Sequence, residues 1–90
     1  MDREMNIIDA MNTLTLRKEL CRKFINKELP LSNFFMLKRG IEEALRWAEE
    51  SLSSNVKPLN YDIWVKQLKN SKEGVGTLVA EMKARVVKND

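Results

Sequence analysis

The sequence predicts an all-α domain, a compact bundle of four or five short helices around a central amphipathic helix. Apolar residues recur with a helical period in every segment, and no segment keeps the period of two that is typical of a half-buried strand. Breaks at Pro30, at Pro58 and at the pair Gly74 and Gly76 divide the chain into four such segments. Because 90 residues suffice for one domain but not for two, we expect residues 1–90 to form a single helical domain.

The first segment carries two apolar stripes that do not line up. Between residues 16 and 27 the apolar side chains, including Leu16, fall on one half of a helical wheel, whereas those of residues 7–11 centre well away from it. A single straight helix would splay this apolar face. We therefore expect a short N-terminal helix, a break near Asn12-Thr13, and a second helix that Thr13 or Thr15 caps.

The segment from about Asn33 to Ser53 is the clearest helix of the chain. Its apolar side chains fill half of the wheel, and Lys, Arg and Glu fill the other half. On that charged half, pairs four residues apart such as Lys38 and Glu42 each contribute about 0.2–0.5 kcal/mol. Ser32 or Asn33 is the expected N-cap. Since so wide an apolar face exceeds what one neighbour covers, this segment is the expected central helix.

Two shorter helices complete the predicted bundle. Asn60 is placed to cap a third helix over about residues 61–70, and Asp62 lies in its first turn, where the helix dipole favours a carboxylate. The last helix is expected over about residues 77–88, after a turn made by both glycines. The side chains expected to face inward from the third helix are Tyr61, Trp64, Val65 and Leu68.

The residue inventory excludes several chemistries. With no histidine and one cysteine, neither a Ser-His-Asp or Cys-His catalytic centre nor a Cys/His zinc site can form within one chain. Cys21 falls on an apolar face, where a thiol is usually buried and inert. Adjacent carboxylates such as Glu42 and Glu43 point about 100° apart on a helix, so neither they nor the similar pair Glu49 and Glu50 form an acid/base couple. We expect no enzymatic activity, no catalytic or metal-binding residues and no cofactor.

Charge and hydropathy indicate where in the cell the protein is expected. There are 16 basic and 13 acidic residues, a formal net charge of +3, and no third of the chain is strongly polarised. No apolar run reaches the length of a membrane span or of a signal-peptide core. A single thiol and the absence of an Asn-x-Ser/Thr pattern favour a reducing compartment. The expected location is the cytoplasm, without membrane attachment.

Four residues of the predicted central helix are candidates for a partner interface. Glycine inside a helix costs about 0.8–1.0 kcal/mol relative to alanine, so Gly40 implies a close approach, either by the third or fourth helix or by a partner. Met36 and Trp47 lie at the border of the apolar face and are either core or interface residues. Phe35 projects into the charged face, where it either covers the turn at Pro30 or binds a partner. A homodimer is one form that this interface would take.

Basic residues form two rows that suit phosphate binding if they converge. A ridge precedes Glu28, and a smaller row lies on the third helix. The predicted nucleic-acid contacts are Arg17, Lys18, Arg22, Lys23, Lys27, Lys66 and Lys69. The alternative for both rows is an ordinary solvated helix face.

The leading hypothesis is a small non-enzymatic regulatory or adaptor protein that binds a larger partner protein. Modulators of larger machines that phages and plasmids carry have this character, although the comparison is one of class and depends on no motif. The alternative is a small dimeric DNA- or RNA-binding regulator that uses the basic rows. The two hypotheses differ in the salt dependence of the complex, which is steep only for a phosphate-driven one.

Overall fold

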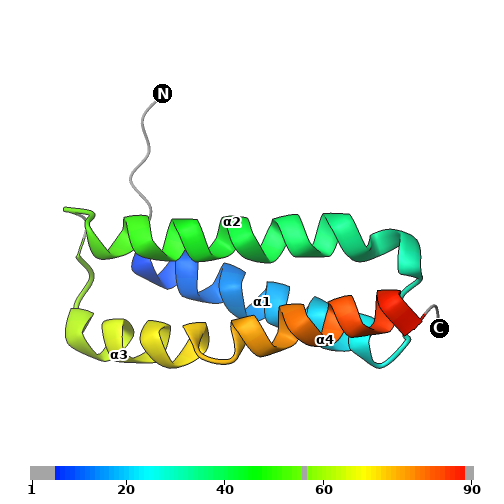
Figure 1. The fold of residues 1–90 in the computed structure, drawn as a ribbon. Coiled ribbons are helices and arrows are strands. Elements are labelled where there is room, and N and C mark those ends of the chain that lie inside the picture. The colour runs from blue at the N-terminus through cyan, green and yellow to red at the C-terminus, as the bar shows by residue number, and fades with distance from the viewer. Residues whose placement is uncertain (1–5, 56, 89–90) are drawn as a thin grey trace.

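The computed structural model describes residues 6–55 and 57–88 and confirms an all-α bundle. Its helices are α1 (Ile7–Ile25), a one-turn 3₁₀ helix (Leu31–Asn33), α2 (Phe34–Leu52), α3 (Tyr61–Lys72) and α4 (Val75–Lys88). Figure 1 shows that α3 and α4 follow one another in the same direction, with α2 running the opposite way. The bundle therefore has three arms, of which the third is bent between α3 and α4. It is elongated and flat, with extents of 45 × 29 × 17 Å.

Helix α1 is continuous, so the predicted break near Asn12-Thr13 was wrong. The side-chain oxygen of Asn6 accepts a hydrogen bond from the N–H of Ile8 (2.8 Å) and caps the helix. The Thr15 hydroxyl, expected in a cap, instead donates to the carbonyl of Met11 within the helix (2.9 Å). Because this hydrogen bond satisfies the Thr15 hydroxyl within α1, the threonine does not interrupt the helix.

Helix α1, and not α2, is the central helix of the bundle, because it packs extensively against α2, α3 and α4, whereas α2 touches α3 and α4 only sparingly. Its buried residues are three, four or seven positions apart, a seven-residue repeat that drifts by about 20° per heptad around the helix. Neighbours on several sides keep this drifting stripe covered, which is why the two stripes need no break between them. Leu16 lies outside the stripe and is 67 % exposed, contrary to expectation. The stripe consists of Ile7, Ala10, Leu14, Cys21 and Phe24.

Side chains of α1, α2 and α4 meet in the core around Phe24. The Phe24 ring is fully buried, and its centroid lies 6.1 Å from that of Phe34 at the start of α2. The guanidinium of Arg85 on α4 lies over the Phe24 ring, 4.5 Å from its centroid. Leu68 of α3, predicted to face inward, and Met82 of α4 are also fully buried. Side chains from all three arms therefore share one core.

Arg85 also closes the end of α1. The chain leaves α1 with Lys27 in the left-handed conformation (φ 66°), and the N–H of Glu28 donates to the carbonyl of Lys23 (2.8 Å). Nη1 of Arg85 donates to the carbonyls of Phe24 (2.7 Å) and Leu29 (2.6 Å). One guanidinium thus fastens α4 to the end of α1 and to the loop that leads into α2.

Gly74 alone makes the bend between α3 and α4, whereas Gly76 lies inside α4. Gly74 has a φ of 81°, a value that costs other residues roughly 1–2 kcal/mol, and Gly76 is helical. A Cβ atom at either position would meet nothing within 4 Å, so only the backbone distinguishes them.

We expect Gly74→Ala to lower the free energy of unfolding by about 1–2 kcal/mol, because the alanine is forced to a positive φ. Gly76→Ala, the matched control, is expected to raise it by up to about 1 kcal/mol through helix propensity. Urea titrations followed by circular dichroism at 222 nm measure both. Equal effects of the two substitutions would contradict these roles.

Candidate functional site

Exposed apolar side chains gather at the start of α2 and the end of α4. Phe35 is 80 % exposed, Met36 63 % and Val87 83 %. Single exposed apolar residues are ordinary on protein surfaces, but a group of them beside a groove is typical of an interaction site. All three belong to helices, so their positions are set by regular backbone and not by a loop.

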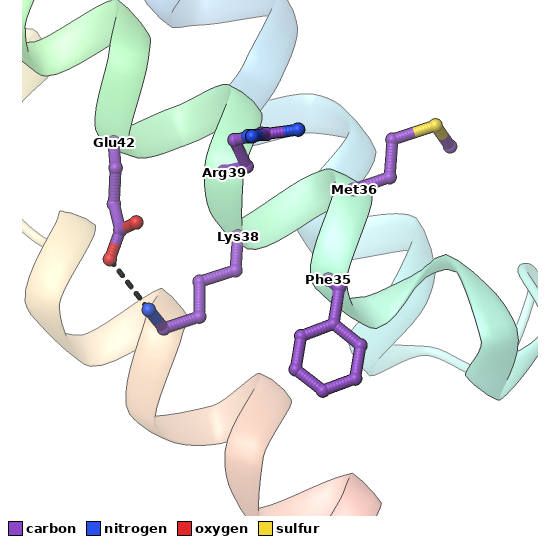
Figure 2. Close-up of a pocket in the computed structure, with 5 residues that line it drawn as sticks. All are labelled: Phe35, Met36, Lys38, Arg39 and Glu42. Carbon is purple, nitrogen blue, oxygen red and sulfur yellow. Dashed lines mark hydrogen bonds and ion pairs between the residues drawn. The ribbon is translucent and has the colours of Figure 1, made fainter.

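Two adjoining depressions lie at this surface. The first, called here the α2–α4 groove, has a volume of about 290 Å³, and the second, called the α2 shelf, about 490 Å³. They share Phe35 and Lys38. In Figure 2, Phe35 and Lys38 extend from α2 toward α4, whereas Met36 and Arg39 point to the other flank of the helix. The groove is lined by Phe34, Phe35, Lys38, Lys83, Val86 and Val87, and the shelf by Phe35, Met36, Lys38, Arg39 and Glu42.

Local geometry explains why Phe35 faces solvent. Phe34 is the first residue of α2 and packs against Phe24 in the core. Neighbouring residues of a helix point about 100° apart, so Phe35 is turned away from the core. Its ring meets that of Phe34 edge to face, with centroids 5.3 Å apart and planes at 68°. The same rule applies to Val86, which is half-buried, and to Val87, which is exposed.

Positive charge dominates the border of the two depressions. Lys38 donates to the carboxylate of Glu42 (2.8 Å), so this acid is paired within its own helix. Within residues 6–55 and 57–88, Arg39 and Lys83 form no ion pair, and both are exposed. Lysine stems line apolar walls while their ammonium groups remain in water. The walls are therefore apolar and the rim is cationic.

The structure brings together two of the four predicted interface residues. Phe35 and Met36 share the α2 shelf, but Gly40 is buried. A Cβ atom on Gly40 would lie 3.3 Å from Cδ and Nη1 of Arg17, so the close approach there is internal and involves α1, not the third or fourth helix. Trp47 is half-buried, lines neither depression and lies about 16 Å from Met36 along α2.

Three residues of α4 complete the groove, and sequence reasoning did not place them there: Lys83, Val86 and Val87. A signal was present, because two adjacent valines at the end of a helix cannot both face the core. That signal indicates that one of the two valines is exposed, but it does not show which residue of another helix lies beside it. Only the packing of α4 along α2 places Val87 beside Phe35.

Two members of the predicted basic ridge are used inside the bundle. Arg17 packs over Gly40 of α2. Lys18 reaches the other way and donates from Nζ to the carbonyls of Ser71 (2.8 Å) and Glu73 (3.2 Å) at the end of α3. Burial lowers the pKa of the Lys18 ammonium, and the charge of Arg22 lowers it further while Glu73 opposes them. These two side chains therefore point to different neighbours instead of forming one phosphate-binding row.

The remaining predicted basic contacts are exposed but mixed with acids. Arg22 lies 3.7 Å from the carboxylate of Glu19. Glu81 of α4 shares one depression with Arg22 and another with Lys27. The other exposed members are Lys23 on α1 and Lys66 and Lys69 on α3. A continuous ridge over the five predicted residues from Arg17 to Lys27 is thus not present.

Cys21 is fully buried in α1, as its place on the apolar stripe predicts. Burial raises the pKa of its thiol, against the opposing charges of Arg17 and Arg22.

Over the described part of the chain, no helix has the length and apolar character of a membrane span. Within the same residues, no group of three or more Cys, Asp or Glu is placed to hold a metal ion.

The chain matches no model of a protein family, no curated protein and no solved structure.

Proposed function

We propose that this protein is a non-enzymatic binding module that acts by occupying a larger partner protein. Its binding surface is the α2–α4 groove together with the α2 shelf. The observation that carries the proposal is the placement of two highly exposed apolar side chains, Phe35 and Val87, on different helices that line one groove. A regulatory or adaptor role follows from occupancy alone and needs no chemistry at the site.

The energetics of these side chains support binding. Burying a phenylalanine is worth about 1.5–3 kcal/mol, which corresponds to roughly a 10- to 100-fold gain in affinity. Aromatic residues and methionine are enriched in protein interfaces, and Phe35 and Met36 lie next to one another. Because Phe35 and Val87 contribute little area to the core, this free energy is available to a partner.

Nucleic-acid binding is the alternative to protein binding. Arg17 and Lys18 make internal contacts, and Glu81 interrupts the basic surface next to α4. The geometry therefore supports protein binding better than phosphate binding.

The test is affinity capture from the native cell with the tagged full chain, with and without nuclease. We expect a protein that survives nuclease treatment and is recovered at least tenfold less with Phe35→Ala. Leu59→Ala is the matched control, since Leu59 is 87 % exposed and belongs to the connection between α2 and α3. Figure 1 shows this connection at the opposite end of the bundle from the start of α2.

Two results would contradict protein binding through this surface. The first is a complex that nuclease abolishes or that weakens about 10³-fold between 50 and 200 mM salt, which indicates phosphate contacts. The second is recovery that Phe35→Ala leaves unchanged. Circular dichroism verifies that each variant is folded.

A further inference from the structure

We infer that the α2–α4 groove binds an amphipathic helix of the partner whose polar face carries carboxylates. This inference rests on the proposed function and names the chemistry of the partner. Three features of the groove carry it: its shape between two helices, its apolar walls and its cationic rim.

The shape of the groove selects a helix as its occupant. The groove lies between α2 and α4, which run in opposite directions (Figure 1). Residues 6–55 and 57–88 contain no strand, so these residues offer an extended peptide no sheet edge to pair with. An apolar groove is the kind of site into which an amphipathic helix inserts side chains one turn apart.

The concave shape also distinguishes a protein helix from a lipid surface. Phe34 is buried and Val86 half-buried, so these two members of the lining are recessed relative to Phe35 and Val87. A flat bilayer would meet the exposed pair first, whereas a side chain of a docked helix can enter between them. The groove therefore fits a protein segment better than a membrane.

The rim selects the charge of the occupant. Lys38 and Lys83 border the α2–α4 groove, and Lys38 and Arg39 border the adjoining α2 shelf, where Glu42 supplies the single carboxylate. Glu42 is already bonded to Lys38, which leaves Arg39 and Lys83 without an acidic partner in the described chain. Glutamate or aspartate flanking the apolar face of a docked helix would pair with Lys83 at the groove and, where the helix extends over the adjoining α2 shelf, with Arg39. Charges at a rim set specificity and the rate of association more than affinity.

The test uses two fluorescein-labelled, stapled helical peptides and the full chain. Both carry leucines at positions i, i+4 and i+7; the residues flanking that face are glutamate in one peptide and lysine in the other. Fluorescence anisotropy near physiological salt measures each dissociation constant. We expect the glutamate peptide to bind at least tenfold more tightly than the lysine peptide, and Phe35→Ala to weaken it at least tenfold.

Charge reversal at the rim gives the sharper result. Lys83→Glu and Arg39→Glu are each expected to weaken the glutamate peptide severalfold and to strengthen the lysine peptide. Lys66→Glu is the matched control, because Lys66 is an exposed lysine on α3 that lines neither depression. It is expected to leave the preference for the glutamate peptide unchanged.

Several results would overturn the inference. They are failure of the glutamate peptide to bind, equal binding of the two peptides, and equal effects of Lys83→Glu and Lys66→Glu. Phe35-dependent binding to phosphatidylserine vesicles without peptide binding would assign the groove to lipid, and a dimer in sedimentation velocity that Phe35→Ala dissociates would assign it to a second copy. Cellular capture that depends on Phe35 but not on Lys83 would overturn the acidic helix and leave the proposed function standing.

Discussion

Replacing Phe24 by alanine is expected to lower the free energy of unfolding by about 3–5 kcal/mol, the usual cost of truncating a fully buried phenylalanine. The ring touches Phe34 of α2 and lies under the guanidinium of Arg85 of α4, so its loss opens a cavity where three helices meet. Domains of this size have a total stability of only about 5–15 kcal/mol. Urea denaturation followed by circular dichroism at 222 nm measures the change.

Phe35→Ala is the matched control for this prediction. It removes the same side chain from a position that is 80 % exposed, where the main loss is the edge contact to Phe34. The expected cost is below about 1 kcal/mol. A similar loss of stability from both substitutions would show that Phe35 belongs to the core, and it would remove the basis for an available apolar surface at this groove.

Replacing Arg85 by alanine is expected to cost about 3 kcal/mol and to lower Tm by roughly 10–20 °C. Its Nη1 atom donates to the carbonyls of Phe24 and Leu29, and hydrogen bonds that involve a charged group are each worth about 1.5–3 kcal/mol. Because Arg85 is half-exposed, water can replace part of the hydrogen bonding that the two carbonyls lose. Thermal and urea unfolding of the full chain measure the change.

Two further substitutions separate the role of the guanidinium from that of its charge. Arg85→Lys keeps the charge but loses the planar fork, so we expect it to recover less than half of the lost stability. Lys88→Ala, at an exposed position in the same last turn, is expected to change stability by no more than about 0.5 kcal/mol. A cost below about 1 kcal/mol for Arg85→Ala would contradict the fastening of α4 to α1 by this side chain.

Much of the fold could be predicted from the sequence because its signals are local. Helical periodicity identified the all-α class, and α2 and α3 begin directly after Asn33 and Asn60, as predicted, although neither asparagine side chain makes a capping hydrogen bond. Where a signal depended on a neighbour, the prediction was wrong. The drifting stripe of α1 looked like two helices, because a wheel cannot show that α2, α3 and α4 cover it on several sides.

The candidate site was predictable only in part, for the same reason. Phe35 and Met36 stand out on the helical wheel of α2, but Val87 joins them only because α4 packs along α2, about 50 residues later in the chain. Arg17 and Lys18 look equivalent in the sequence, yet one lies over Gly40 and the other holds the end of α3. Their adjacent positions on one helix aim them at different arms of the bundle.

The sequence by itself determined that this protein is helical, that it lacks a histidine-based centre, and that apolar side chains stand at the start of α2. These properties follow from backbone propensity, residue chemistry and the 3.6-residue turn, none of which needs a neighbour. Only the tertiary structure decided that α1 is central, that Gly40 serves an internal contact, and that lysines of α2 and α4 border one apolar groove. Each of these depends on which helices pack together, and a periodic pattern shows which face is apolar but not what covers it.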